Sequence, residues 1–304
     1  MTDDAYDCLI VGGGPAGLTA AIYLARFHRR VLVVDKNEGR MSLIPLSHNY
    51  AGYPQGVVGT DLLERMRNQA RDFGAELRHG EVTALHREGE GFRAGTDAGP
   101  VRARRVLLAT GVVNLRPPVG EEDHDAAVAR GLLRYCPICD AYEQTGKRIG
   151  VLGADRHALA EALFLRTYSP DIVMVALHAV DLDDDERTRA KAAGIRVVQA
   201  PVSGLRFNDE VTVHLADGTE VQVDTLYVAL GSRTRNDLGT MMGTELCDGE
   251  CFVTDDQQRT SAPGIYAAGD AVEGLDQISS AMGTGAQAAV AIHNDLREMD
   301  GHTL

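Results

Sequence analysis

The sequence of 304 residues contains no tryptophan, and aromatic residues make up only 5% of it. It has five cysteines, an odd number that does not suit the disulfide framework of a small secreted domain. No apolar run reaches the roughly 18 residues that a membrane-spanning helix needs. The acidic N-terminus shows no hydrophobic secretory segment. We therefore expect a cytoplasmic protein without a membrane span.

Basic residues are also scarce relative to acidic ones. The chain has 30 Lys and Arg against 44 Asp and Glu, which gives a formal net charge of −14. Such a charge disfavours nucleic acids and anionic membrane surfaces as partners. What the chain does contain is 44% hydrophobic residues and 33 glycines. A chain of this length and composition is typical of a two-domain α/β protein rich in turns.

A dinucleotide-binding fingerprint lies near the N-terminus. The apolar strand Cys8–Val11 runs into the sequence GGGPAG at residues 12–17, and a helix is expected over Leu18–Arg26. A second strand, Val31–Val34, ends at Asp35. Strand, glycine motif, helix, strand and acid occur in the order that this fold requires.

Each glycine of the fingerprint has a physical role. Gly12 permits the tight turn, Gly14 lets the backbone approach a pyrophosphate, and Gly17 allows close packing of helix on strand. The free N–H groups of the helix then face the phosphates. Asp35 is placed to accept hydrogen bonds from ribose hydroxyls.

A pair of cysteines in the middle of the chain indicates redox chemistry. Cys136 and Cys139 are separated by two residues, and Asp140 follows directly. The same spacing binds zinc, but zinc needs two further ligands, and the remaining cysteines offer no second pair of this kind. We predict a dithiol that cycles with a disulfide, with the carboxyl of Asp140 moving the proton, and no metal. The alternative for Asp140 is a helix N-cap.

A further motif follows in the C-terminal part. The segment 260–270 reads as a turn, a buried strand and an exposed acid, Asp270, and a helix rich in small residues is expected over Ser279–Leu296. The glycine fingerprint, the run Ala109–Gly111, the Cys-x-x-Cys-Asp motif and this Gly-Asp segment occur in the order seen in low-molecular-weight thioredoxin reductases. Over nearly its whole length the chain therefore resembles that family, and in particular its nicotinamide-independent members.

The resemblance implies an α/β fold with two Rossmann-like (three-layer ββα) domains, the second inserted into the first. Residues 1–116 and 244–304 would form the two halves of an FAD-binding domain. Residues 117–243 would form an inserted domain of the pyridine-nucleotide type that carries the cysteine pair. The family also implies a homodimer.

The resemblance further assigns residues to FAD, with Asp270 at the ribityl chain and Gln277 and Asn49 near the flavin ring. For Asn49 the alternative is an ordinary turn residue. The predicted cofactor-binding set is Gly12, Gly14, Pro15, Ala16, Gly17, Asp35, Lys36, Asn49, Val82, Ala109, Thr110, Gly111, Gly269, Asp270, Gln277 and Ile278. By the same resemblance, Cys139 lies nearer the flavin and Cys136 exchanges with the external sulfur, while Asp140 is the general acid and base.

The second nucleotide motif departs from the family. After the strand Arg148–Leu152, the family has glycines where this chain has Ala154 and Asp155. A side chain at 155 obstructs the backbone approach, and its carboxylate repels a pyrophosphate. The family's arginine cluster for the 2′-phosphate of NADPH corresponds here to Ala176, Leu177, His178 and Leu182. We therefore expect a surviving fold whose NADPH site is lost. The alternative is ordinary drift that leaves weak NADPH binding.

Three enzymatic interpretations remain. The first is an FAD-dependent disulfide oxidoreductase that exchanges two electrons between flavin, the Cys136–Cys139 pair and an external thiol or disulfide, with a donor or acceptor other than NADPH. The substrate would be a thioredoxin-like protein or a small dithiol, and ferredoxin or another electron carrier would be the further partner. The other two are an NADPH-dependent thioredoxin reductase with an eroded motif and an oxygen-dependent dithiol oxidase. A non-enzymatic flavin-binding scaffold is disfavoured by the intact dithiol motif.

Two further cysteines lie close together late in the chain. Cys247 and Cys251 flank Asp248, Gly249 and Glu250, a combination that indicates an exposed turn. We expect two inert loop cysteines, with a second dithiol relay as the alternative.

Overall fold

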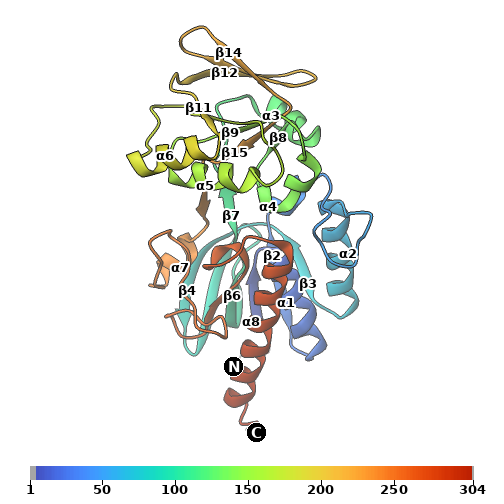
Figure 1. Cartoon of the computed structure of the whole chain (residues 1–304). Helices are drawn as coiled ribbons and strands as arrows, with labels where there is room; N and C mark the ends of the chain where they lie inside the picture. Colours follow the sequence, from blue (N-terminus) through green and yellow to red (C-terminus); the bar gives the residue numbers. More distant parts are fainter. Residues whose placement is uncertain (1–4, 303–304) are drawn as a thin grey trace. The chain divides into compact units, whose positions relative to one another are not determined.

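The computed structural model describes residues 5–302, and the chain forms two compact units (Figure 1). Unit 1 consists of the segments that run up to Ile44, from Val57 to Val113, and from Arg233 onwards. Unit 2 consists of Pro45–Gly56 and Asn114–Ser232. The middle of the chain is thus an insertion into a unit that its two ends build together.

Unit 1 is built on a seven-stranded sheet in the order β3-β2-β1-β6-β5-β4, with β17 also paired to β6. Its strands are β1 (Tyr6–Val11), β2 (Val31–Asp35), β3 (Glu76–His79), β4 (Val82–Glu88), β5 (Gly91–Thr96), β6 (Val101–Leu108) and β17 (Ile265–Ala267). Strand β6 is long enough for two partners on one edge. Its start pairs antiparallel with β5, and its end pairs parallel with β17. The parallel strands all end at the same edge, which is where such sheets bind ligands.

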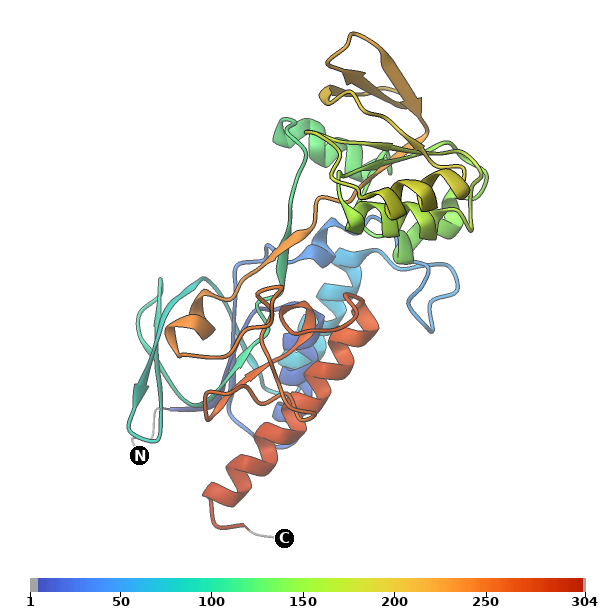
Figure 2. The same ribbon diagram turned by 60° about the vertical axis from the view of Figure 1, so that its left-hand side comes forward.

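The long helices cover one face of this sheet, and the short helix that contains Leu238 packs on the other. They and the shorter turns of unit 1 are α1 (Pro15–Arg26), η1 (Arg40–Leu43), α2 (Gly59–Asp72), α7 (Asp237–Met241), η3 (Gly269–Ala271) and α8 (Ile278–Met299). Helices α1 and α8 lie side by side (Figures 1 and 2). Their contact is close because a Cβ on Gly285 would lie 2.3 Å from the carbonyl oxygen of Ala16. Helix α1 begins at Pro15, three residues before the predicted start, because proline is well suited to the first helical position.

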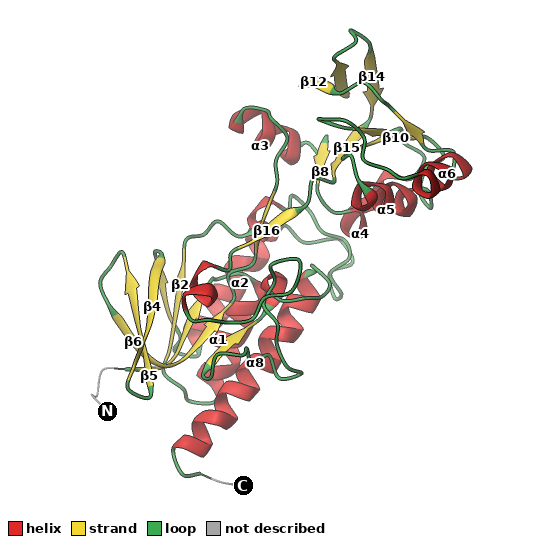
Figure 3. Cartoon of the chain, turned by 90° about the vertical axis from the view of Figure 1, so that its left-hand side faces the viewer, coloured by secondary structure: helices red, strands yellow, loops and turns green. Residues whose placement is uncertain are grey.

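Unit 2 has a five-stranded parallel sheet in the order β11-β10-β9-β15-β8 and a separate antiparallel sheet, β12-β13-β14. Its strands are β8 (Leu133–Arg134), β9 (Ile149–Leu152), β10 (Ile172–Val175), β11 (Arg196–Val197), β12 (Val202–Phe207), β13 (Val211–Leu215), β14 (Glu220–Val223) and β15 (Thr225–Val228). Alternate side chains of the parallel sheet enter two different cores. Val151 packs toward α5 and α6, whereas Leu152 packs toward the antiparallel sheet. This alternation gives three layers, which Figure 3 displays.

The helices and short turns of unit 2 are α3 (Glu121–Ala129), α4 (Pro137–Asp140), η2 (Ala141–Gln144), α5 (Arg156–Leu165) and α6 (Asp184–Ala192). The chain passes between the units through β7 (Val112–Asn114) and β16 (Ser232–Thr234), which pair as a two-stranded sheet. The predicted α/β class, with a parallel sheet in each unit, is confirmed. Within residues 5–302, no helix is both long and apolar enough to cross a membrane.

Two glycines of α8 provide a matched test of the helix contact. Gly285 is buried against α1, whereas Gly283 is exposed and has nothing within 4 Å of its Cβ position. We expect Gly285→Ala to destabilise the protein by about 1–3 kcal/mol, because the two helices must separate. Gly283→Ala should stabilise it by roughly 0.5–1 kcal/mol, since alanine is the better helix former. Urea unfolding measures the change in the free energy of unfolding for each variant. Changes of the same sign in both variants would contradict the close contact.

Candidate active site

The glycine-rich turn after β1 brings backbone atoms so close that side chains have no room. Gly12 has a φ of +107°, and a Cβ on it would lie 2.3 Å from the carbonyl oxygen of Ala109. A Cβ on Gly17 would lie 2.0 Å from the carbonyl oxygen of Gly12. Both positions therefore require glycine for the turn itself, in agreement with the packing roles predicted from the sequence.

Gly14 is different, because nothing lies within 4 Å of the position that its Cβ would take. It precedes Pro15, and the N-terminus of α1 has neither a side-chain cap nor an acidic residue in its first turn. The unpaired N–H groups and the dipole make this end partially positive. Open space beside such a terminus fits an anionic group of the size of a pyrophosphate.

Asp35 borders the same turn. Its carboxylate fills the place of a side chain on Gly13, since a Cβ there would lie 2.5 Å from Asp35 Oδ2. Beyond it, Lys36 is ion-paired with Glu81 at 2.9 Å, and Val82 is the buried first residue of β4. These residues lie around the carboxyl end of β2, beside the glycine turn.

The loop after β6 closes the other side of the turn. Ala109 donates its N–H to the carbonyl of Val11 at 2.9 Å, and Gly111 has a φ of +63°. The hydroxyl of Thr110 donates to the carbonyl of Arg235 at 2.7 Å. Thr110 therefore fixes the loop on the segment in which the chain re-enters unit 1.

The C-terminal Gly-Asp segment lies at the start of α1. A Cβ on Gly269 would lie 2.9 Å from the Cβ of Ala16, and its N–H donates to Thr284 Oγ1 at 3.0 Å. The structure thus brings together motifs from both ends of the sequence. Gln277 precedes α8, of which Ile278 is the first residue, and its Nε2 donates to the carbonyl of Asp276 at 2.9 Å.

Asp270 carries a perturbed carboxyl. Burial raises its pKa to about 6, and the nearby Asp276 adds to this, while Arg40 opposes both effects. Arg40 Nη1 lies 3.1 Å from Asp270 and 2.7 Å from Asp276. Sequence reasoning missed Arg40, because an arginine in a connection after β2 carries no signal of a partner so distant in sequence.

In unit 2 the two sulfurs of the Cys-x-x-Cys motif are bonded to each other. Cys136 caps α4, and the N–H of Cys139 donates to its carbonyl at 3.0 Å. Both cysteines are half-buried, and Ile138 between them is 51% exposed. The observed disulfide is the oxidised form of the predicted redox pair.

Asn49 lies in unit 2 with this loop. Its Nδ2 donates to the carbonyl of Ile138 at 3.4 Å, and its Oδ1 accepts from Ser47 at 2.9 Å. His48 and Glu143 form an ion pair at 3.0 Å. These contacts explain why the segment Pro45–Gly56 packs with unit 2, whereas the other predicted cofactor residues belong to unit 1.

Asp140 is held by two side chains that the sequence analysis did not identify. Its Oδ1 accepts a hydrogen bond from the hydroxyl of Tyr227 at 2.7 Å, and its Oδ2 pairs with the guanidinium of Arg134. Arg134 and Tyr227 are direct neighbours in the register of the parallel strands β8 and β15. Thr225 completes the arrangement by accepting from Arg134 Nε at 3.2 Å.

These contacts set the protonation of Asp140. Burial raises the pKa of its carboxyl, and Arg134 and the hydrogen bond from Tyr227 oppose this effect. Asp140 ends α4 and also stands at the N-cap position of η2, as the alternative interpretation expected, but its side chain makes no capping hydrogen bond there. A part-buried carboxyl directly after the disulfide is suited to proton transfer.

The second nucleotide turn has filled its own anion site. The carboxylate of Asp155 caps α5 by accepting the N–H of Ala158 at 3.0 Å. It therefore occupies the helix N-terminus at which a pyrophosphate would bind. Gly153 remains close-packed, since a Cβ there would lie 2.7 Å from the carbonyl oxygen of Ala229. The close packing of the turn is therefore kept, but a negative carboxylate stands at the helix terminus that would otherwise be partially positive.

Three of the four positions of the expected phosphate cluster are apolar and lie wholly or partly inside the protein. Leu182 is 6% exposed and belongs to the core beneath α5, Ala176 is buried, and Leu177 packs on the opposite core. Only His178 is exposed. Asp183 caps α6 and forms a capping box with Glu186. None of the four positions carries an arginine or lysine, the side chains that bind a 2′-phosphate most strongly.

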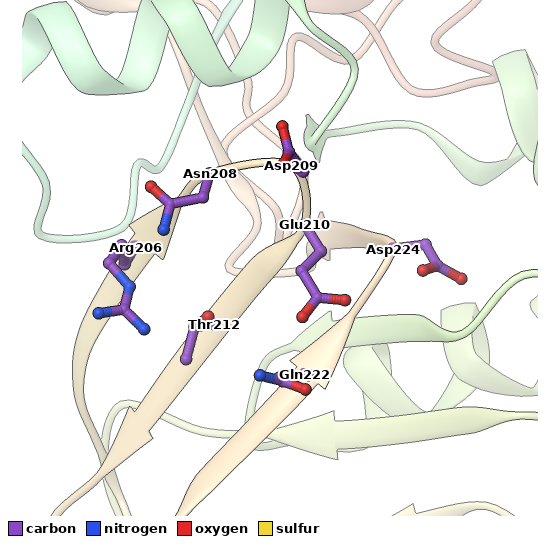
Figure 4. A pocket seen from close by; sticks show the side chains of 7 residues that line it. All are labelled: Arg206, Asn208, Asp209, Glu210, Thr212, Gln222 and Asp224. Carbon is purple, nitrogen blue, oxygen red and sulfur yellow. The ribbon is translucent and has the colours of Figure 1, made fainter.

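A shallow pocket lies elsewhere in unit 2, on the antiparallel sheet (Figure 4). Its lining residues are Arg206, Asn208, Asp209, Glu210, Thr212, Gln222 and Asp224. Arg148 is ion-paired with Glu210 at 2.7 Å and with Asp224 at 2.5 Å. Two acids of the pocket therefore share one arginine. The pocket contains none of the predicted site residues.

The sequence of this chain is similar to those of known proteins. The sequence profile described as "Pyridine nucleotide-disulphide oxidoreductase" matches residues 6–285. A thioredoxin reductase from Aquifex aeolicus is 30% identical, and the alignment covers 95% of this chain and 93% of the relative.

Two solved structures are also similar to this chain. The crystal structure of HlmI has 32% identity and a TM-score of 0.90, and the match covers 97% of this chain and 94% of that one. The atypical thioredoxin reductase TRi from Desulfovibrio vulgaris Hildenborough has 33% identity and a TM-score of 0.55, with 97% and 99% covered. The similarity therefore extends over both units.

The Asp140 contacts predict how its protonation responds to substitution. Tyr227→Phe and Arg134→Gln each remove a group that favours the ionised form, so each should raise the pKa of Asp140 further. Tyr142→Phe is the control, because Tyr142 is 78% exposed and is not a partner of Asp140 in this set of contacts. Carboxyl ¹³C NMR against pH, with the resonance assigned through Asp140→Asn, measures the midpoints. Unchanged midpoints in both variants would contradict the assigned contacts.

Proposed function

The chain belongs to the pyridine nucleotide-disulphide oxidoreductase family, and from this premise we propose a specific thioredoxin reductase-like reaction. The enzyme exchanges two electrons between FAD, the Cys136–Cys139 pair and an external dithiol or disulfide. A thioredoxin-like protein or a small dithiol is the substrate. The observation that carries the proposal is the Cys136–Cys139 disulfide with Asp140 held next to it by Arg134 and Tyr227.

The glycine turn of unit 1 fits FAD. Gly14 and the uncapped start of α1 are suited to the pyrophosphate, and Asp35 is suited to the ribose. Asp270, a carboxyl whose pKa burial raises to about 6, is suited to hydrogen bonds with the ribityl chain. When bound, FAD supplies a two-electron acceptor or donor for dithiol chemistry. The remaining members of the predicted set, Asn49, Gln277 and Lys36 among them, stay proposals.

The dithiol step uses residues of unit 2. An external thiolate attacks Cys136, the Cys136–Cys139 bond breaks, and Cys139 leaves as the thiolate. Asp140 donates or accepts the accompanying proton, and Arg134 and Tyr227 hold its carboxyl in place. In the reverse direction the same groups return the disulfide. The assignment of the two sulfurs rests on the family resemblance.

We further propose that the electron donor or acceptor is not NADPH. Asp155 occupies the helix terminus that the pyrophosphate needs, and three of the four phosphate-cluster positions are apolar. A carrier such as ferredoxin or a thiol substrate takes the place of NADPH. A homodimer and a cytoplasmic location stay predictions.

Gly14 offers a test of FAD binding that leaves the fold intact. We expect the wild-type protein to be yellow and to hold about one FAD per chain. Gly14→Val should fold normally, since its side chain meets no protein atom within 4 Å of Cβ, yet lose FAD. Gly120→Val in unit 2 is the control, because its Cβ position is also open. Flavin content after purification and circular dichroism report the two properties. A wild-type chain that takes up no FAD would refute the proposal.

The loss of the NADPH site predicts weak reduction by nicotinamides. Each missing charge-assisted contact costs on the order of 1.5–3 kcal/mol. Two or more missing arginine contacts imply roughly two to four decades in affinity. Anaerobic bleaching of the flavin band should therefore be slow with NADPH and NADH alike, and faster with a dithiol. Rapid, saturable bleaching by micromolar NADPH would refute this proposal and show that the chain is an NADPH-dependent enzyme.

A further inference from the structure

Cys247 and Cys251, expected as two inert loop cysteines, are bonded to each other as a second disulfide. The pair lies in unit 1, between α7 and β17, whereas Cys136 and Cys139 lie in unit 2. Within residues 5–302 the one cysteine outside a disulfide is Cys8, which is buried. The chain therefore carries two disulfides in two units, and the proposed function uses one of them.

The turn that holds this disulfide is supported without it. The N–H of Cys247 donates to the carbonyl of Cys251 at 2.8 Å, and the N–H of Glu250 donates to the carbonyl of Cys247 at 2.9 Å. Leu246 and Phe252 continue the pairing as an antiparallel bridge, and Phe252 is buried in the core. A disulfide that closes so short a loop removes less entropy from the unfolded chain than one that closes a long loop. The bond therefore contributes less to stability than a long-range disulfide would.

The disulfide is also open to solvent. Both cysteines are half-exposed, and Asp248, Gly249 and Glu250 between them are all exposed. An external sulfur can approach without any part of the core moving. Redox-active disulfides are those that an external thiolate can reach.

The two sulfurs are not equivalent. The N–H of Cys251 donates to Cys247 Sγ at 3.2 Å, and the described hydrogen bonds show no corresponding donor to Cys251 Sγ. A donor to sulfur stabilises the thiolate, and a stabilised thiolate is the better leaving group. The geometry therefore favours attack on Cys251 with Cys247 as the leaving sulfur.

We propose that Cys247–Cys251 is a second thiol–disulfide exchange site, which accepts two electrons from an external dithiol. The two exposed carboxylates of the turn, Asp248 and Glu250, favour a reductant with basic groups beside its dithiol. The site does not depend on the chemistry proposed for Cys136 and Cys139.

The external dithiol is the reductant in this exchange. A thiolate of the reductant attacks Cys251 Sγ, the Cys247–Cys251 bond breaks, and Cys247 leaves as a thiolate held by the N–H of Cys251. The second thiol of the reductant then attacks the reductant sulfur that is bonded to Cys251. The mixed disulfide breaks, and Cys251 is released as a thiolate. The reductant loses two electrons and two protons and becomes a disulfide. Cys247 and Cys251 gain them and end as two thiols.

Thiol counting on the full-length double variant Cys136→Ser/Cys139→Ser tests the proposal. The protein is equilibrated with mixtures of reduced and oxidised dithiothreitol, alkylated under native conditions and weighed by mass spectrometry. We expect two alkyl groups per chain to appear in a single two-electron transition and to disappear on reoxidation. The variant that also carries Cys247→Ser/Cys251→Ser should gain none, since Cys8 is buried. Alkylation that needs unfolding, or two thiols that persist under full oxidation, would overturn the proposal.

Single variants in the same background test the order of the sulfurs. With an aromatic disulfide as the probe, Cys251→Ser, which leaves Cys247 free, should react several-fold faster near neutral pH than Cys247→Ser. A cationic small thiol should reduce the disulfide faster than an anionic one, and Asp248→Asn/Glu250→Gln should narrow that ratio. Equal or reversed rates in the first comparison would overturn the assigned leaving sulfur, and equal rates in the second would overturn the preference for a basic partner.

Discussion

Backbone atoms around the start of α1 approach each other so closely that no side chain fits between them. The carbonyl of Gly12 lies under Gly17, the carbonyl of Ala109 lies under Gly12, and Gly285 brings α8 onto Ala16. The sheet, the first helix and the last helix are fixed by these contacts. The open space at Gly14 exists because the atoms around it are held in this way, and the candidate cofactor site follows from the packing.

The same constraint explains what the sequence could predict. Glycines that a close backbone contact requires can be recognised in the sequence itself. The first turn, its strands and the long C-terminal helix could therefore be placed from their spacing. Arg40, Arg134 and Tyr227 could not. Arg40 acts on Asp270 from a distant connection. Arg134 and Tyr227, which are neighbours across β8 and β15, act together on Asp140 in α4. No short-range pattern marks such a partner.

The second disulfide was missed for a related reason. Its spacing of four suits no familiar motif, and only the turn geometry brings Cys247 to Cys251. The environments of the two disulfides also differ. Cys139 is followed by a part-buried acid that two side chains hold, whereas the other pair has exposed acids and a backbone N–H directed at one sulfur. The groups around the two disulfides therefore differ: they are side chains in unit 2 and, in unit 1, a backbone N–H beside exposed acids.

The cap formed by Asp155 has a consequence for how this chain can evolve. Removing the cap costs about 1 kcal/mol before any nucleotide contact is gained. An arginine in place of Leu182 would enter a hydrophobic core and destabilise the chain further. At these two positions, a step toward a nicotinamide site therefore lowers the stability of the fold before any contact with a nucleotide is gained. If the NADPH site is lost as proposed, its recovery would need other substitutions that raise stability first.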